Sequence, residues 1–314
     1  MTSKGKVLIV DEMHESILPL FEEAGYEPVY LPIITREQVL EVIHEFVGLV
    51  IRSKTTVDKE LVDLAPKLKF VARAGAGLDK LDAEYLKSKG IVIVNAPEGN
   101  RDALAEHALG MLLGVLHRQH FSYGQIKSGV WDREGNRGVE LRDKVVGIYG
   151  VGYMGKAFAE KLSGLGCEVI GYDKYYPNFS TEFIRSVSIE EFMKSTEILS
   201  IHVPLTKETE YLFDGDYLNE FKKLKILINT ARGKILKLDS LPELLMSGAL
   251  YGAALDVLEN ERLETYTEKE KEAMDQLIKH PNVLITPHVG GWTYESYQRI
   301  NEVLVDKLKK YFQI

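Results

Sequence analysis

The sequence has few of the features that mark secreted or membrane-embedded proteins. Its 314 residues include one cysteine, Cys167, so no internal disulfide can form. No stretch approaches the run of about eighteen apolar residues that a membrane helix needs, since the nearest candidate, LAEHALGMLLGVL, contains Glu106 and His107. The N-terminal stretch MTSKGKVLIVDE has too short an apolar run for a signal peptide. We therefore expect a soluble, cytoplasmic protein that binds no membrane.

Clusters of basic residues are lacking as well. The chain carries 39 Lys and Arg residues against 47 Asp and Glu residues, a net charge of −8, and contains no basic block. A nucleic-acid partner would require a basic surface to neutralise phosphates, so we expect no such partner. We also assign no metal ligands.

Short apolar runs alternate with amphipathic stretches along the chain. Such runs are typical of strands buried on both faces, and helices between them make neighbouring strands parallel. The runs are KVLIVD, FVGLVI, LKFVARAG, GIVIVNAP, KVVGIYG, CEVIGYD, EILSIHVP, KILINTARG, LYGAALDV and NVLITPHVGG. They are too many for one sheet, and 314 residues exceed the roughly 100–200 of one domain. We predict an α/β protein with two doubly wound parallel sheets and a cleft between them.

A break between the two domains is predicted in NAPEGNRDALAEHALG. There Pro97 and Gly99 precede a long helical pattern that begins near Arg101, so we place a hinge at this point. A last helical pattern, 293–312, is too short to be a domain and is expected to return to the first one. The predicted domains are therefore 1–98 with 291–314, which is discontinuous, and 99–290.

The stretch KVVGIYGVGYMG ends in glycines with dinucleotide-binding spacing. Gly150, Gly152 and Gly155 follow a strand pattern and precede a helix pattern, and Asp173 ends the next strand about 20 residues on, as that fingerprint requires. The glycines permit a tight turn and close approach of a pyrophosphate to the helix N-terminus. Asp173 would accept hydrogen bonds from ribose hydroxyls and repel a 2′-phosphate. The pattern favours NAD as cofactor and a Rossmann domain at 99–290, while Lys174 beside the acid leaves NADP open.

Three further segments place chemically capable side chains at the carboxyl ends of apolar strands, where open α/β sheets bind ligands. They are INTARG with Arg232, ALDVLENE with Glu261 and ITPHVGG with His288. Taken singly, these are typical of a surface arginine, a loop carboxylate and a structural histidine. Together they supply a guanidinium for a carboxylate, an imidazole for a proton, and an acid that orients the imidazole. Hydride transfer on a 2-hydroxy acid needs these three groups.

The combination of motifs resembles the D-isomer-specific 2-hydroxyacid dehydrogenases over nearly the whole chain. The resemblance extends through VLIVDE, GLVIRSKTTV, ARAGAGLDKLD, VNAPEGN, GVGYMG, HVPLTKET, NTARG, LDVLENE and TPHVGGWT. It implies a flavodoxin-like substrate domain and three catalytic residues, Arg232, Glu261 and His288. It places Asp256 at the nicotinamide carboxamide. The other cofactor positions that it implies are Ala76, Gly150, Gly152, Tyr153, Met154, Gly155, Asp173, His202, Val203, Pro204, Thr209, Thr230, Ala231, Arg232, His288, Gly290 and Gly291.

The chain departs from that family at several places. Arg262 follows Glu261 where a proline is usual, and the charged stretch RLETYTEKEKEAMDQL comes before the next strand. Ala76 stands where a threonine is frequent, so backbone amides would have to serve there. The chain also ends after its last helical pattern, and we expect no C-terminal regulatory domain of the kind found in longer relatives.

Basic residues of the first domain bear on the substrate. VIRSKTTV ends a strand with Arg52, Ser53 and Lys54, and ARAG ends the next with Arg73. Guanidinium groups bind phosphate through paired hydrogen bonds, so a phosphorylated D-2-hydroxy acid such as 3-phosphoglycerate is expected, whose oxidation belongs to serine biosynthesis. A dicarboxylate or a smaller acid such as glycerate, hydroxypyruvate, lactate or 2-hydroxyglutarate stays open, as does a merely solubilising role. The predicted substrate residues are Arg52, Ser53, Lys54, Arg73, Ala74, Gly75, Ala76, Gly77, Asn100, Arg232 and His288.

Two expectations concern partners. The helical pattern 101–118 with QIKSGVWDREGNRGVEL resembles the family's dimerisation arm, which predicts a homodimer. The fold also occurs in NAD-sensing corepressors that work as binding proteins. The chain lacks the long polar tail that recruitment proteins tend to carry, so an enzyme is the favoured interpretation.

Overall fold

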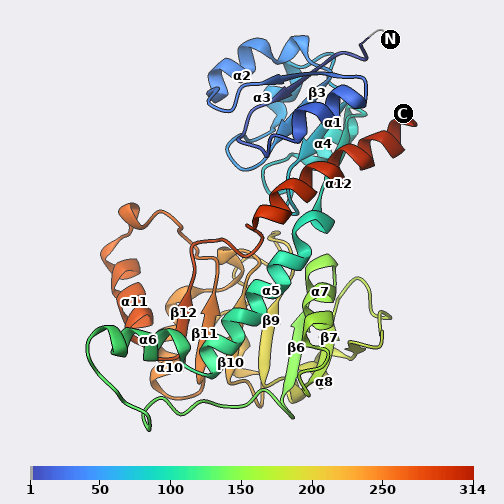
Figure 1. Ribbon diagram of the computed structural model, residues 1–314. Helices are drawn as coiled ribbons and strands as arrows, with labels where there is room; N and C mark the ends of the chain where they lie inside the picture. The colour runs from blue at the N-terminus through green and yellow to red at the C-terminus, as the bar shows by residue number, and fades with distance from the viewer. Residues whose placement is uncertain (1–2) are drawn as a thin grey trace. The chain divides into compact units, whose positions relative to one another are not determined.

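The computed structural model describes residues 3–314, which form two compact units. One unit runs to Arg101 and resumes at Trp292–Ile314, and the other is Asp102–Gly291. Each unit contains one parallel sheet with helices on both faces (Figure 1). The predicted α/β class with two doubly wound parallel sheets is confirmed.

The first unit contains a five-stranded parallel sheet in the order β2-β1-β3-β4-β5, which is the flavodoxin-like order. Its strands are β1 (Lys6–Ile9), β2 (Glu27–Tyr30), β3 (Gly48–Ile51), β4 (Phe70–Arg73) and β5 (Val92–Asn95). Its helices are α1 (Ile17–Glu23), α2 (Arg36–Val42), η1 (Ile43–Glu45), α3 (Lys59–Asp63), α4 (Ala83–Ser88) and α12 (Tyr294–Phe312).

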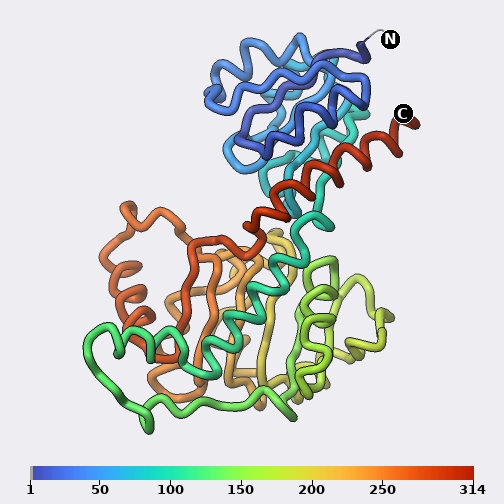
Figure 2. The backbone as a smooth tube through the Cα atoms, viewed as in Figure 1, coloured from blue at the N-terminus to red at the C-terminus, as the bar shows by residue number. Residues whose placement is uncertain are grey.

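The central strand β1 shows how this unit builds a core on both faces of its sheet. Val7 and Ile9 pack with residues of α1 and α12 on one face, and Leu8 packs with residues of α2, α3 and α4 on the other. All three are fully buried, because successive side chains of a strand point to opposite faces. The C-terminal helix therefore completes the core of the N-terminal sheet, and Figure 2 shows its red trace beside the blue segments.

The second unit contains a seven-stranded parallel sheet in the order β12-β11-β10-β9-β6-β7-β8. Counted from β6 as the first strand, this is the Rossmann order with one strand added. The strands are β6 (Val145–Tyr149), β7 (Glu168–Tyr172), β8 (Arg185–Ser186), β9 (Ile198–Ile201), β10 (Ile226–Asn229), β11 (Gly252–Leu255) and β12 (Val283–Ile285).

Helices cover both faces of this second sheet. Residues of α5 (Pro97–Leu116) and α7 (Tyr153–Leu162) form a core on one face, and residues of α8 (Ile189–Ser195), α10 (Leu241–Met246) and α11 (Glu268–Lys279) form a core on the other. The remaining helices are α6 (Gln119–Lys127), α9 (Gly215–Asn219), η2 (Gly233–Ile235), η3 (Leu238–Ser240) and η4 (Leu263–Thr265). The charged stretch noted after Glu261 thus forms η4 and most of α11.

Two edge strands are missing from the sequence-based prediction. β2 has the sequence EPVY, with both ends exposed, and β8 has two residues. Both are terminal in their sheets, so they bury less apolar surface than the central strands and show no continuous apolar run. Pro28 is tolerated in β2 because an edge strand can leave one side of its backbone unpaired.

The helix that was expected to begin near Arg101 begins earlier, so Pro97 and Gly99 lie inside α5 rather than before it. Pro97 is the first helical residue, a position where its missing N–H costs nothing. Gly99 lies against α12, where an added Cβ would be 2.7 Å from the Cα of Ile300. The glycine therefore serves close helix packing.

The longest helices are α5 and α12, with 20 and 19 residues. Within residues 3–314, no helix is both long enough and apolar enough to cross a membrane.

Candidate active site

The turn between β6 and α7 contains the three glycines of the predicted fingerprint. Gly150 has φ +95°, a region that glycine favours, and an added Cβ would lie 2.7 Å from Val203. Gly155, which follows Tyr153 and Met154 in α7, lies so close to the Gly150 carbonyl that a side chain would collide with it. Gly152 is the N-cap of α7, provides no side-chain cap and has open space beside it. The helix N-terminus is therefore accessible to an anion such as a pyrophosphate.

Asp173, directly after β7, braces this turn. Its Oδ2 accepts a hydrogen bond from the Val151 backbone N–H at 2.9 Å. Its Oδ1 accepts from the N–H groups of Tyr175 and Tyr176 at 3.0 and 3.1 Å. The carboxylate is thus held at the carboxyl end of β7, beside the glycine-rich turn.

Lys174 is paired with an acid that the sequence did not reveal. Its ammonium forms an ion pair with Glu208, and the Tyr175 hydroxyl donates to the same carboxylate at 2.6 Å. The hydrogen bond to Glu208 raises the pKa of Lys174. Glu208 therefore neutralises the charge of Lys174, so Lys174 is less available to bind the 2′-phosphate of NADP.

The loop after β9 packs against the glycine-rich turn, since a Cβ added at Gly150 would lie within 3 Å of His202 and Val203. The His202 ring packs against Phe158 of α7 with ring centroids 5.6 Å apart, and its Nε2 lies 2.8 Å from Ser200 Oγ. Burial lowers the pKa of His202 to about 4, so the ring is neutral at pH 7. Thr209 closes the loop by donating to the Pro204 carbonyl at 2.6 Å. These residues support the turn, and their contact with a cofactor stays a prediction.

The turn after β10 holds Arg232 in place. Asn229 Oδ1 accepts from the Ala231 N–H, and Asn229 Nδ2 donates to the Arg232 carbonyl, both at 3.0 Å. The guanidinium Nη1 donates to the Ala231 carbonyl at 2.7 Å. The buried Thr230 Oγ1 contacts no hydrogen-bond partner within residues 3–314, so it could bond to a ligand.

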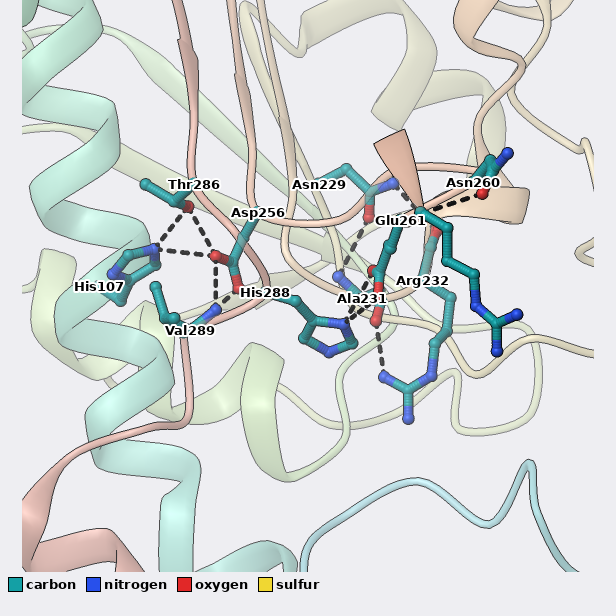
Figure 3. Close-up of polar contacts among 12 residues, drawn as sticks. His107, Asn229, Ala231, Arg232, Asp256, Asn260, Glu261, Thr286, His288 and Val289 are labelled. Atoms are coloured by element: carbon teal, nitrogen blue, oxygen red, sulfur yellow. Dashed lines mark hydrogen bonds and ion pairs between the residues drawn. The ribbon is translucent and has the colours of Figure 1, made fainter. Parts of the chain in front are cut away.

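His288 and Glu261 form a hydrogen-bonded pair. His288 Nδ1 lies 2.8 Å from Glu261 Oε1 and 3.0 Å from Oε2, and both side chains are half exposed. Figure 3 shows the Arg232 guanidinium directed toward the same carboxylate and ring. The structure thus brings together the three predicted catalytic residues, which come from the loops after β10, β11 and β12.

Asp256 clamps the loop that carries His288. It is 2% exposed, and its carboxylate accepts from Thr286 Oγ1 at 2.6 Å and from the N–H groups of Val289 and Gly290 at 2.9 and 2.8 Å. The Asp256 carbonyl accepts from the His288 N–H at 2.8 Å, where the His288 backbone has φ +54°.

The same carboxylate contacts His107 of α5, whose Nε2 lies 3.3 Å from Asp256 Oδ1 and 3.0 Å from Thr286 Oγ1. Burial raises the pKa of Asp256, but hydrogen bonds from His107, Thr286 and two backbone N–H groups outweigh this and lower it overall. Asp256 therefore remains ionised at neutral pH and positions the His288 turn. Its predicted contact with the nicotinamide carboxamide stays a prediction, as do those of Gly290 and Gly291.

The predicted substrate residues of the first unit lie in two loops after neighbouring strands. After β3, the buried Asp11 accepts from the backbone N–H of Arg52 at 2.6 Å and of Lys54 at 3.2 Å, with the exposed Ser53 between them. The Arg52 Nη1 donates to the Glu12 carbonyl at 3.1 Å. The Lys54 Nζ donates to the Pro32 carbonyl at 2.7 Å. Asp11 thus fixes the loop that carries both cations.

The second loop, 74–77, follows Arg73 at the end of β4. Ala74 donates to the Ile51 carbonyl, Gly75 accepts from the Ala96 N–H at 2.9 Å, and Ala76 accepts from Asn95 Nδ2 at 2.7 Å. Since β3 and β4 are adjacent and parallel, their carboxyl ends share one edge of the sheet. The buried Asn100 Oδ1 has no hydrogen-bond partner in the described part of the chain.

Four residues that hold these loops were missed in the sequence: Asp11, Asn229 and Thr286, which lie at or after strand ends, and His107, which lies in α5. Three of them end or follow a strand, the signal that identified Arg232, Glu261 and His288. His107 is a polar residue within the apolar pattern of α5. Nothing in their local sequence singled them out, because the roles of Asp11, His107 and Thr286 depend on contacts with distant parts of the chain.

Residues 109–290 match the family model described as "D-isomer specific 2-hydroxyacid dehydrogenase, NAD binding domain". The chain belongs to this family. The family resemblance drawn from the motifs is therefore confirmed.

Two curated proteins illustrate the similarity. The D-3-phosphoglycerate dehydrogenase of Methanocaldococcus jannaschii is 33% identical to this chain over 311 residues. The match covers 97% of this chain and 57% of that protein, so the chain spans little more than half its length. The hydroxypyruvate reductase of Thermotoga maritima is 32% identical over 277 residues, 88% of each chain.

A solved structure of the same fold is D-lactate dehydrogenase from Aquifex aeolicus, complexed with NAD and lactic acid. It superposes with a TM-score of 0.81 at 25% identity and covers 98% of this chain and 95% of that one.

The second unit fits the cofactor of this dehydrogenase family, NAD. The open N-terminus of α7 at Gly152 suits the pyrophosphate, Asp173 provides an acceptor for ribose hydroxyls, and Thr230 Oγ1 provides a buried group that lacks a partner within residues 3–314. When bound, NAD accepts or supplies the hydride.

We expect Asp173→Asn to weaken the preference for NAD over NADP. Asparagine can keep its single oxygen on the Val151 N–H but gives up the hydrogen bonds from Tyr175 and Tyr176, and it removes the negative charge that repels a 2′-phosphate. The ratio of the dissociation constants of NADPH and NADH should fall about tenfold, since charges in this range interact by about 1 kcal/mol or more. Titration of cofactor fluorescence gives both constants. Equal affinity of the unmodified protein for the two cofactors would contradict the assignment.

Proposed function

We propose that the protein is an NAD-dependent dehydrogenase that interconverts a D-2-hydroxy acid and its 2-oxo acid. The observation that carries this proposal is the Glu261–His288 hydrogen bond with Arg232 directed toward it (Figure 3). An oriented imidazole, a carboxylate and a guanidinium are the groups that this reaction requires from the chain.

Each side chain has a distinct role in the proposed reaction. The Glu261 carboxylate can only accept, which assigns the proton on Nδ1 of His288 and leaves Nε2 to take the hydroxyl proton in oxidation or return it in reduction. Glu261 then stabilises the imidazolium. The Arg232 guanidinium binds the substrate carboxylate in a bidentate manner and favours negative charge on the C2 oxygen.

The proposed substrate is 3-phospho-D-glycerate, oxidised to 3-phosphooxypyruvate, a step of serine biosynthesis. Arg52, Lys54 and Arg73 at one edge of the first sheet support a phosphate-bearing acid, as does the similarity to D-3-phosphoglycerate dehydrogenase. The second candidate is glycerate with hydroxypyruvate, because the similarity to hydroxypyruvate reductase covers 88% of both chains.

A substrate panel tests these proposals. The purified protein is given NAD with 3-phosphoglycerate, glycerate, D-lactate or 2-hydroxyglutarate, and NADH with hydroxypyruvate, and NADH absorbance is followed. The highest kcat/KM with 3-phosphoglycerate supports the first candidate, and the highest with glycerate or hydroxypyruvate supports the second. Binding of NADH without turnover of any acid would instead indicate a corepressor-like binding protein.

Glu261→Gln is expected to lower kcat by about tenfold or more, with little change in KM. The amide oxygen can still accept from Nδ1, but the charge that stabilises the imidazolium is lost, and about 1.4 kcal/mol in the transition state is a factor of ten. Glu264→Gln, an exposed change in the same loop, is the matched control. An unaltered kcat would leave Glu261 as a loop carboxylate without a role in turnover.

We also propose a homodimer formed through α6 and the segment 128–141. This region exposes large apolar side chains, with Trp131 86% exposed and Tyr123 65% exposed. Large exposed apolar patches mark protein–protein interfaces. Light scattering on the eluting protein gives the mass, and the mass of one chain would exclude the dimer.

A further inference from the structure

The guanidinium of Arg52 lies against two aromatic rings of its own unit. Its Cζ is 4.3 Å from the centroid of Trp292 and 5.9 Å from that of Tyr297. The two rings lie 4.9 Å apart and are tilted by 56°. The guanidinium therefore lies over the Trp292 ring, and this cation–π contact, called the Arg52–Trp292 stack below, is favoured by the attraction between a cation and an aromatic face.

The elements that carry this stack are joined by hydrogen bonds. Thr293 caps α12 through a reciprocal pair with Ser296, which fixes the start of the helix between Trp292 and Tyr297. Asn301 Nδ2 donates to the His14 carbonyl and to Ser16 Oγ, both at 3.0 Å. This contact ties α12 to the loop after β1, whose Asp11 and Glu12 hold the backbone and Nη1 of Arg52.

Arg52 is thus held at three places. Its backbone N–H donates to Asp11, its Nη1 donates to the Glu12 carbonyl, and its guanidinium lies over the Trp292 ring. A stacked guanidinium still presents N–H donors along its edge, where carboxylate and phosphate groups bind. An unrestrained arginine loses side-chain conformational entropy when it binds an anion. Because the contact with Trp292 already restricts the side chain, less entropy is lost on binding.

We propose that Trp292, supported by Tyr297, is a positioning residue that sets Arg52 for the anionic group at the end of the substrate remote from C2. This inference rests on the proposed function, in which Arg52 binds that group. It assigns a role in substrate selection to an aromatic residue at the start of the C-terminal helix. The stack favours acids that carry a phosphate over acids with an uncharged end.

Steady-state kinetics of four variants tests the proposal. Trp292→Leu should raise KM for 3-phosphoglycerate about fivefold, the size expected of an exposed cation–π contact, with kcat and KM for NAD unchanged. KM for glycerate, which has no phosphate, should stay the same. Trp292→Phe keeps an aromatic face and should restore most of the affinity. Arg52→Ala should raise KM for 3-phosphoglycerate further, and adding Trp292→Leu to it should cause no additional rise.

The outcomes separate this inference from the proposed function. If Arg52→Ala raises KM for 3-phosphoglycerate but Trp292→Leu does not, the positioning role is overturned and the proposed function stands. If neither change alters that KM, Arg52 does not bind the substrate and the inference falls with that part of the proposal. Equal rises for 3-phosphoglycerate and glycerate in Trp292→Leu would show a merely structural role and overturn it.

A spectroscopic readout is independent of turnover. Trp131 and Trp292 are the two tryptophans of the chain, so Trp131→Phe leaves Trp292 as the sole indole. Its emission should change saturably on titration with 3-phosphoglycerate, and this change should be absent when Arg52→Ala is added. An emission that does not respond, in a protein that turns over 3-phosphoglycerate, would overturn the proposal.

Discussion

His288→Ala is expected to lose nearly all turnover while the protein still binds NADH. General acid–base catalysis contributes about 100- to 10,000-fold, and the proposed function gives this role to Nε2 of His288, since Nδ1 is hydrogen-bonded to Glu261 at 2.8 Å. The glycine-rich turn that fits the cofactor lies elsewhere in the sheet and is not altered. The measurements are kcat with the best substrate of the panel and the dissociation constant of NADH.

A second variant separates lost chemistry from backbone strain. His288 has φ +54°, a conformation that costs alanine about 1–2 kcal/mol but suits asparagine. His288→Asn should therefore fold as the unmodified protein does and be as inactive as the alanine variant. His44→Ala, at an exposed histidine of η1, is the control and should keep full activity. A His288 variant with more than about a tenth of the normal kcat would remove this residue from the mechanism.

Arg232→Gln should lower kcat/KM about 100- to 10,000-fold through both KM and kcat. Losing a bidentate pair with the substrate carboxylate removes two charged hydrogen bonds of about 1.5–3 kcal/mol each. The loss of positive charge beside the reacting oxygen also lowers kcat. The turn itself should persist, because Asn229 holds it through Ala231 N–H and the Arg232 carbonyl.

Arg232→Lys distinguishes the charge from the geometry of the guanidinium. Lysine keeps the charge but cannot form the two parallel hydrogen bonds, so its kcat/KM should lie between those of the glutamine variant and the unmodified protein. Lys234→Gln, at an exposed cation two residues on, is the matched control. A rise in KM alone, with kcat unaltered in Arg232→Gln, would limit Arg232 to substrate binding.

Local patterns were sufficient for the central parts of the fold and for several parts of the candidate site. The apolar runs predicted the central strands because a strand buried on both faces must be apolar throughout, as β10 is. The same argument failed for β2 and β8, which lie at sheet edges and bury little. Proline and glycine at 97 and 99 resembled a linker, but one starts α5 and the other admits α12, and only the packing of two distant helices distinguishes these cases.

Local patterns in the sequence predicted the family, the two parallel sheets and the glycine-rich turn at Gly150–Gly155. These depend on short-range requirements, such as a positive φ, a close backbone approach and the position of polar residues after buried strands, and a single sequence displays them directly. The folded structure was needed to show that Asp256 holds the His288 turn together with His107 and Thr286, and that Arg52 lies over the Trp292 ring. Each of these contacts joins segments far apart in the chain. The interactions that stabilise them therefore leave no local pattern in the sequence.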